Sequence, residues 1–324
     1  MRNILIYVIA AFVISLIAAP FIIKGLRRLK AGQAILHYVD FHASKSGTPT
    51  MGGFIFILPM ILLSPIFLRS NTPFALVIVV SSLGFALLGF LDDFIKVKTK
   101  KNLGLRAYQK IIGQGGIALL VAIFYFLVNQ EGRILIPFVN IYFDIGWFII
   151  PLVFIAIIAT TNSVNLTDGI DGLAGSVTIA YLVFFIVISY FVSVGGSLLE
   201  LGQMHWISAI TIGGLMTFLM FNTNKAKVFM GDTGSLYLGS LVATLAIFSF
   251  MSFFIIILGI MYVVSSLSVI IQVAYFKKTK GKRVFLMTPF HHHLEKKGFA
   301  EARIVAVYLI ITVVIGLGIV ASFL

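Results

Sequence analysis

The chain has 324 residues, of which 60% are hydrophobic and only 11% are charged, and its mean hydropathy is +1.09. A soluble globular domain carries about a quarter charged residues, so these values exclude a water-soluble protein. The net charge of +13 would suggest nucleic acid binding in a soluble chain, whereas in a membrane protein it marks the cytoplasmic side, and no nucleic acid partner is expected. The absence of cysteine excludes disulfides and thiolate metal sites.

The apolar stretches predict ten membrane spans, each of which needs about 20 residues. Eight of them are 3–23, 53–68, 73–91, 111–128, 145–161, 173–194, 206–221 and 304–324. Residues 236–276 form a further run without a charged residue, which as one helix would be about 60 Å long, twice the hydrocarbon thickness. This run therefore holds two spans that turn near Met251–Ser252.

The distribution of basic residues sets the predicted orientation. Five loops on one side hold 21 of the 24 Lys and Arg residues. These loops are 24–52, 92–110, 162–175, 222–235 and 277–303. Short loops rich in Lys and Arg stay in the cytoplasm, so these loops are predicted to face the cytosol and both termini the periplasm. With nine spans, the last basic loop would lie outside, and we reject nine for that reason.

The predicted fold is therefore an all-α polytopic membrane protein with about ten transmembrane helices. It forms a single integral membrane domain, 1–324, whose five cytoplasmic loops make up the active site. Residues 133–145 are expected to form a small external β-hairpin, and residues 195–205 a short external helix.

Carboxylates gather at the ends of spans on the predicted cytoplasmic side. They are Asp92, Asp93, Asp168, Asp171 and Asp232. The last three precede predicted spans, where Asp is a favourable N-cap and Asp-Gly a favourable turn, so each also has a structural explanation. Asp92 and Asp93 differ, because two carboxylates at the C-terminal end of a helix oppose its macrodipole. Lys96 offsets part of this cost as an i,i+4 partner of Asp92, and a bound cation would offset the rest.

The residue types on this side favour phosphate chemistry. Carboxylates without cysteine suit a hard cation such as Mg²⁺, and the surrounding Lys and Arg suit a phosphate or diphosphate substrate. The last basic loop adds His291, His292 and His293. Three consecutive histidines do not easily present their nitrogens to one tetrahedral zinc ion, so phosphate contact or acid–base catalysis is preferred.

Two other functional classes stay open at this point. An anion transporter would place its charged sites near the bilayer midplane, whereas these lie at one membrane face. An intramembrane aspartyl protease needs two Asp within facing helices, and the second copy of the signature seen at Asp232-Thr233-Gly234 is missing.

Five motifs occur in order along the chain. They are SGTPTMGG (46–53), LDDFIK (91–96), NLTDGIDG (165–172), MGDTGS (230–235) and PFHHHLE (289–295). Together they resemble the phospho-N-acetylmuramoyl-pentapeptide transferase (translocase I) family, within the superfamily of polyprenyl-phosphate N-acetylhexosamine-1-phosphate transferases. The resemblance spans almost the whole chain.

This resemblance implies a Mg²⁺-dependent phosphoglycosyl transferase of peptidoglycan synthesis. Undecaprenyl phosphate would attack the sugar-proximal phosphorus of UDP-N-acetylmuramoyl-pentapeptide, giving lipid I and UMP. Another UDP-N-acetylhexosamine is the alternative donor. The resemblance further implies a homodimer in the lipid bilayer of the bacterial cytoplasmic (inner) membrane, with its cleft facing the cytoplasm.

The resemblance also assigns roles to residues of this chain. It implies that Asp92, Asp93, Asp232 and His291 are catalytic, and that Asp232 binds the metal. The residues implied in substrate binding are Lys45, Thr50, Lys96, Asn165, Asp168, Asp171, Asn222, Phe229, Gln272, His292 and His293. Since the second pKa of a phosphate monoester is about 6, the lipid phosphate is largely ionised, and direct attack is preferred over a covalent phospho-Asp route, which stays open. The lipid acceptor also requires an apolar groove beside Asp92 and Asp93 that opens to the bilayer.

Overall fold

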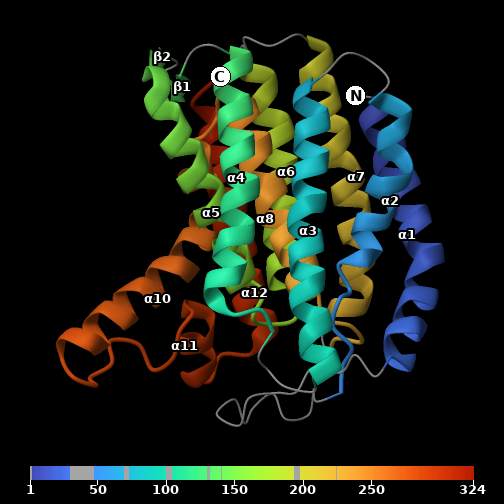
Figure 1. Cartoon of the computed structure of the whole chain (residues 1–324), viewed down its shortest axis with the longest axis vertical. Helices are drawn as coiled ribbons and strands as arrows, with labels where there is room; N and C mark the ends of the chain where they lie inside the picture. The colour runs from blue at the N-terminus through green and yellow to red at the C-terminus, as the bar shows by residue number, and fades with distance from the viewer. Residues whose placement is uncertain are drawn as a thin grey trace.

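The computed structural model describes residues 2–29, 47–68, 73–99, 104–129, 132–139, 141–192, 198–223 and 225–324. The helices form one bundle, with both chain termini and the two strands at the same end (Figure 1). The first half of the chain contains α1 (Arg2–Arg28), α2 (Phe54–Phe67), α3 (Pro73–Thr99), α4 (Ala107–Asn129), β1 (Arg133–Ile136), β2 (Ile141–Asp144), η2 (Gly146–Phe148) and α5 (Ile149–Thr167). The second half contains α6 (Leu173–Phe191), α7 (Leu198–Asn222), α8 (Gly231–Phe248), α9 (Phe254–Leu258), α10 (Ile260–Lys278), α11 (Phe290–Lys296) and α12 (Glu301–Ala321).

The predicted all-α membrane fold is confirmed. Within the described ranges, eight helices are long and apolar enough to cross a membrane. They are α1, α3, α4, α5 together with η2, α6, α7, α10 and α12. The shorter helices α2 and α8 correspond to the two remaining predicted spans. An even number of spans agrees with the two termini lying at one end (Figure 1), while the side of the membrane that this end faces stays a prediction.

The structure corrects the expected external helix at 195–205. In its place α7 is one continuous helix from Leu198 to Asn222. Two polar residues that fall before the predicted span 206–221 have partners inside the bundle. Gln203 Nε2 donates to the carbonyl of Phe67 at 2.9 Å, and His205 Nε2 lies 2.7 Å from Ser189 Oγ. These polar side chains therefore lie within α7, which begins eight residues before the span predicted from hydropathy.

The apolar run 236–276 turns where the sequence predicted, because α8 ends at Phe248 and α9 begins at Phe254. Its second half is interrupted once more, at Gly259, which separates α9 from α10. Gly259 N donates to the carbonyl of Ile255, and a Cβ at this position would collide with that carbonyl. After this break α10 leads away from the bundle (Figure 1).

The predicted β-hairpin is present. β1 and β2 pair antiparallel, with Ile134 opposite Phe143. The carboxylate of Asp144 accepts hydrogen bonds from the backbone of Gly132 and Gly146, at 2.7 and 2.8 Å, which closes the base of the hairpin.

Helix α8 forms the centre of the bundle and is buried at every residue from Thr233 to Phe248. Glycines allow its first turn to approach two neighbours. A Cβ at Gly89 of α3 would collide with the carbonyl of Asp232, and a Cβ at Gly53 would collide with the backbone of Gly234. The carboxyl-terminal part of α3 and the amino-terminal end of α2 are thus in contact with the start of α8, where the predicted site lies.

Candidate active site

Three of the predicted carboxylates form a cluster. Asp92 and Asp93 of α3 and Asp232 in the first turn of α8 each offer an oxygen atom, and these atoms all lie within 4.8 Å of one another. Asp92 is 3% exposed and Asp93 is 2% exposed. The expectation that the pair ends its helix is wrong, because α3 continues about two turns further, to Thr99. The pair therefore lies inside the helix, with Lys96 and Lys98 in the last turn.

Two lysines offset much of this negative charge. Lys96 Nζ lies 3.0 Å from Asp232 Oδ2 and 3.9 Å from Asp93 Oδ1, and it forms the predicted ion pair with Asp92. Lys110 Nζ, at the start of α4, lies 2.8 Å from Asp232 Oδ2. Lys110 is absent from the predicted site, since it belongs to none of the five motifs. With all three carboxylates ionised, this cluster of three carboxylates and two ammonium groups has a formal charge of −1, which favours a cation.

The two adjacent carboxylates of α3 have different partners. Asp93 Oδ2 accepts hydrogen bonds from the backbone N–H and the hydroxyl of Thr233, at 2.9 and 2.8 Å. Asp92 Oδ1 accepts one from Leu105 N at 2.7 Å. Asp93 is thereby fixed to α8, whereas Asp92 is fixed to the segment between α3 and α4.

Helix α5 contributes to the same cluster at its carboxyl end. Asn165 Nδ2 lies 2.6 Å from Asp232 Oδ1 and 2.7 Å from Ser235 Oγ. Asp168 follows as the C-cap of α5, where its backbone N–H donates to the carbonyls of Val164 and Asn165, and its carboxylate has no hydrogen-bond or ion-pair partner among the described residues. Burial and, after it, the carboxylates of Asp232 and Asp93 raise the pKa of Asp168 well above its ordinary value. Asp168 is therefore available for a cation or a hydrogen-bond donor of a substrate.

The structural explanation of Asp168 and Asp171 as N-caps is not supported. The N-cap of α6 is Gly172, which adopts φ = 78° and receives no side-chain cap. Asp171 Oδ2 instead accepts a hydrogen bond from Ala226 N at 2.9 Å. It thus ties the loop before α6 to the segment before α8.

Asn222 and Phe229 border that same segment, and Thr50 belongs to the segment before α2, which pairs with it. Asn222 accepts from Gly172 N and donates to the carbonyl of Val228, both at 2.9 Å, so its amide holds two loops together. Phe229 exchanges backbone hydrogen bonds with Pro49 and Gly52. Thr50 is buried, and its hydroxyl lies where a Cβ on Gly231 would point. These predicted substrate residues connect the loops around the cluster.

The histidine loop, which carries His291 to His293, contacts the carboxylate side of the site at Gly169. His291 of α11 is fully buried, and its ring packs so closely on Gly169 that a Cβ there would collide with Nε2. His292 pairs with Glu295, while His293 Nδ1 accepts from Leu286 N at 3.1 Å. Burial and Lys297 lower the pKa of His293, which suits this acceptor role. The rings of His291 and His292 also contact each other, with their centroids 4.3 Å apart, whereas the ring of His293 stacks on that of Phe290.

Among the described residues, Gln272 forms its hydrogen bonds away from the cluster. Gln272 Oε1 accepts hydrogen bonds from Val284 N and Phe285 N, at 3.1 and 2.9 Å, and so orders the loop that leads to α11. Lys45 lies outside the described residues. Besides Lys110, sequence reasoning missed Ser235 and Glu295, which lie within recognised motifs, and Glu301, which accepts from Asp171 N at 3.3 Å.

Comparisons with known proteins agree with this arrangement. The model of glycosyl transferase family 4 matches residues 75–250, and signature 1 of the phospho-N-acetylmuramoyl-pentapeptide-transferases matches residues 45–57. A phospho-N-acetylmuramoyl-pentapeptide-transferase of Clostridium botulinum (strain Alaska E43 / Type E3) is 45% identical over 310 residues, covering 94% of this chain and 91% of the relative. The chain belongs to the phospho-N-acetylmuramoyl-pentapeptide-transferase family.

Other members of the family show the same extent of similarity. The enzyme of that name from Halalkalibacterium halodurans is 43% identical over 320 residues, covering 95% of this chain and 93% of the relative. That from Thermoanaerobacter sp. (strain X514) is 40% identical over 316 residues, with 97% and 96% covered. The family model spans α3 to α8, so it includes Asp92, Asp93 and Asp232.

Proposed function

We propose that this phosphoglycosyl transferase moves phospho-N-acetylmuramoyl-pentapeptide from UDP-N-acetylmuramoyl-pentapeptide to undecaprenyl phosphate, giving lipid I and UMP. The observation that carries the proposal is the buried cluster of Asp92, Asp93 and Asp232 with Lys96 and Lys110, in a chain of this family. A site that combines carboxylates with lysines suits a metal-assisted reaction between two phosphates.

The residues of the cluster fit a Mg²⁺ ion. All three candidate ligands are carboxylates, which are the donors that this hard cation prefers, and their oxygens are near enough to share one ion. We propose that Asp232 holds the metal, with Asp92 and Asp93 beside it. When bound, Mg²⁺ would neutralise charge on the diphosphate and on the departing UMP.

Side chains of the protein would reduce the repulsion between the two substrates and position the lipid phosphate. A diphosphate and a lipid phosphate repel each other by about 3 kcal/mol for each pair of charges at about 5 Å and an effective dielectric near 20. Lys96 and Lys110, both at the cluster, reduce this repulsion. Asp92 and Asp93 position the lipid phosphate, and His291 contacts the phosphates from the side of Gly169.

The transfer proceeds by direct attack. An oxygen of the lipid phosphate, already ionised because its second pKa is about 6, bonds to the sugar-proximal phosphorus. The bond from that phosphorus to the oxygen of UMP breaks, and UMP leaves with the electron pair. No general base is needed, so Asp93 can stay hydrogen-bonded to Thr233 throughout.

An apolar cavity supports the proposed lipid acceptor. It has a volume of about 550 Å³ and lies between α5, α9 and α10. Its lining includes Ile155 and Ile256, which are 62% and 52% exposed, and it extends to Ser163, two residues before Asn165. The cavity is thus accessible from the lipid side and follows α5 toward the cluster. We propose that it holds part of the polyprenyl chain.

The proposed location is the bacterial inner membrane, with the cluster facing the cytoplasm, and the proposed assembly is a homodimer. The 21 basic residues on one side support the orientation, and the family resemblance supports the dimer. Because the chain has no cysteine, single cysteine probes at Thr99 and Lys280 can test the orientation. Both should be shielded from an impermeant reagent added outside intact cells, and labelling at Lys280 would contradict this orientation.

The proposed reaction is tested by UMP release from the purified chain. UMP should appear only when UDP-N-acetylmuramoyl-pentapeptide, undecaprenyl phosphate and Mg²⁺ are all present. UDP-N-acetylglucosamine serves as the matched donor, because it shares the nucleotide, the diphosphate and the N-acetyl group. Faster release from UDP-N-acetylglucosamine would assign the chain to another branch of the superfamily, and release that does not need the lipid phosphate would contradict the transfer.

A further inference from the structure

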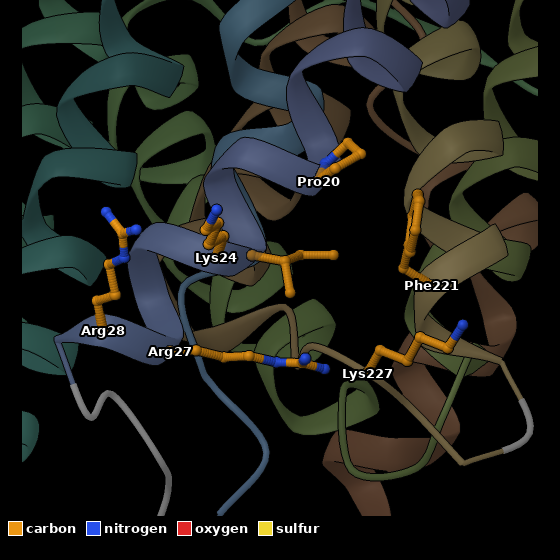
Figure 2. A pocket seen from close by; sticks show the side chains of 7 residues that line it. Pro20, Lys24, Arg27, Arg28, Phe221 and Lys227 are labelled. Atoms are coloured by element: carbon orange, nitrogen blue, oxygen red, sulfur yellow. The ribbon is translucent and has the colours of Figure 1, made fainter.

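A second, basic pocket lies between α1 and α7 and plays no part in the reaction described above. Its described lining consists of Pro20, Ile23, Lys24, Arg27, Arg28, Phe221 and Lys227, and its volume is about 550 Å³ (Figure 2). Four of these side chains are cationic and none is acidic. None of them forms an ion pair with a described carboxylate. The pocket therefore has a local positive charge that an anion would complement.

The packing of the two helices explains why a space opens here. Earlier in α1 the helices are in close contact, since a Cβ at Gly213 would collide with the carbonyl of Val8, and Thr217 Oγ1 donates to the carbonyl of Phe12 at 3.0 Å. The pocket begins about one helical turn beyond Thr217. At this level α1 contains Pro20, whose missing N–H interrupts the helical hydrogen bonds.

The pocket lies at a membrane boundary. α1 and α7 are both candidate spans, and the pocket lies at the carboxyl-terminal end of each. These ends are on the same side of the bundle as the end of α3 (Figure 1). Exposed apolar residues precede the pocket lining in both helices: Leu16, 38% exposed, lies one turn before Pro20, and Met220, 58% exposed, directly precedes Phe221. A molecule with an anionic phosphate and long acyl chains would complement this arrangement, in which exposed apolar residues lie beside a basic pocket.

We propose that this pocket binds the headgroup phosphate of an anionic membrane phospholipid such as phosphatidylglycerol. Basic pockets between membrane helices on the cytoplasmic side are typical of lipid headgroup sites. Arg27 of α1 points toward Lys227 in Figure 2, so the two cations come from different elements and border one space. The apolar floor of Pro20, Ile23 and Phe221 suits the glycerol and the first acyl carbons, and offers little to a soluble nucleotide.

A bound headgroup would connect α1 to the segment that precedes the catalytic helix. Lys227 N donates to the carbonyl of Phe221 at 2.7 Å, and Phe229 N donates to the carbonyl of Pro49 at 2.8 Å. This segment continues directly into α8 and Asp232. The lipid would therefore stabilise the arrangement of loops around the site. The proposal does not rest on the transfer reaction, because lipid binding is measured without substrates.

The test measures lipid binding to the purified full-length chain in neutral detergent. Fluorescent phosphatidylglycerol is titrated at fixed micelle concentration, with phosphatidylcholine of the same acyl chains as the neutral lipid. The double variant Arg27→Gln/Lys227→Gln should bind phosphatidylglycerol about 30-fold more weakly, because each cation near a lipid surface contributes about 1 kcal/mol. Its phosphatidylcholine binding should be unchanged.

A matched control removes the same charge elsewhere. Lys280→Gln/Lys282→Gln alters two exposed lysines of the loop after α10, at the same end of the bundle, and should bind phosphatidylglycerol like the wild type. The single variant Lys24→Gln, which keeps Arg27 and Lys227, should weaken binding about fivefold and covers the case that the double variant does not fold.

Several outcomes would overturn the proposal. One is wild-type phosphatidylglycerol binding by both the double variant and Lys24→Gln. Equal losses in the pocket variant and the control would reduce the effect to general surface charge. Displacement by millimolar glycerol 3-phosphate would show a site for a soluble phosphate. Displacement by undecaprenyl phosphate as effectively as by phosphatidylglycerol itself would assign the pocket to the substrate lipid.

Discussion

The helices α8 and α10, which come from one apolar run of the sequence, differ in how they are held. α8 is buried from Thr233 to Phe248 and lies at the centre of the bundle (Figure 1). The buried residues of α10 are Met261, Tyr262, Ser265 and Ser268, all in its first half. Its second half is largely exposed, with Ile270 at 61%. The first helix is fixed by protein on all sides, whereas the second extends toward lipid.

This difference divides the site into two parts. The carboxylate part, on α3, α5 and α8, is fixed by helix packing and by the hydrogen bonds of Asp93 and Asn165. The histidine part, on α11, follows the exposed end of α10 and touches the carboxylate side where His291 meets Gly169. Metal binding should therefore depend on the central packing, and the placement of His291 on contacts that include the one with Gly169.

The largest effect is expected from a change of charge in the carboxylate part. Asp232→Asn keeps the size of the side chain but removes the carboxylate partner of Lys110 and one of the three carboxylate partners of Lys96. Turnover should fall by about 10³-fold, the loss typical of removing a major electrostatic group from an active site, and Mg²⁺ activation should weaken. UMP release measured against Mg²⁺ concentration tests both effects.

The control for this variant is Asp144→Asn, at the hairpin end of the bundle, which should retain wild-type turnover. Membrane insertion of both variants should be normal. Wild-type turnover with an unchanged Mg²⁺ dependence in Asp232→Asn would refute the role of Asp232.

A second prediction compares the two helices directly through their packing. Leu241 of α8 is fully buried, whereas Ile270 of α10 is 61% exposed. Leu241→Ala should lower the free energy of unfolding by about 2–5 kcal/mol, because it leaves a cavity. Ile270→Ala should change it by no more than about 0.5 kcal/mol. Denaturant unfolding in the same detergent measures both, and equal losses would mean that α10 is as firmly packed as α8.

The contact between the two parts of the site is tested at Gly169. Gly169→Ala places a methyl group against the His291 ring and should displace it. Turnover should fall about 10- to 100-fold, as for other small misplacements of catalytic groups, while the melting temperature stays near that of the wild type. Gly202→Ala is the matched control, since a Cβ there meets nothing within 4 Å. A Gly169→Ala enzyme with full activity would exclude His291 from the reaction.

The sequence was sufficient to predict most of the spans, the hairpin and the residues of the cluster. Hydropathy locates the approximate ends of the spans, and their even count places both termini on one side. The five motifs lie at or near the span ends on the other side. It failed where the deciding interaction is between segments remote in sequence. Lys110 belongs to no motif, and only the approach of α4 to α8 shows that it pairs with Asp232. Similarly, the partners of Gln203 and His205 lie on other segments, so α7 was divided wrongly.

Hydropathy also could not predict that α8 is buried within the bundle whereas the second half of α10 is exposed. Both belong to one apolar run, and an apolar residue scores equally whether it faces lipid or protein. The same holds for Gly89. Because it has no side chain, α3 can approach the carbonyl of Asp232, but a glycine within a predicted span does not indicate which segment packs against it.

The smallest expected effect concerns two aspartates at opposite ends of the bundle. The pKa of Asp168 is raised, first by burial, so its ionised form destabilises the folded state once the pH exceeds the unfolded value of about 3.9. The pKa of Asp144 is lowered, first by the N–H of Gly146 and then by that of Gly132, so its ionised form stabilises the folded state above the same pH. Asp168→Asn should therefore raise the melting temperature at pH 7 by a few degrees, and Asp144→Asn should lower it. The difference for Asp168→Asn should vanish as the pH falls below about 4, where that carboxyl group is protonated in both states. The difference for Asp144→Asn should fade only at lower pH, as the pH falls through the lowered pKa of Asp144 in the folded state. Thermal unfolding without Mg²⁺ or substrate across this pH range measures the effect, and a destabilised Asp168→Asn at pH 7 would show that the Asp168 carboxylate has a stabilising partner in the folded protein.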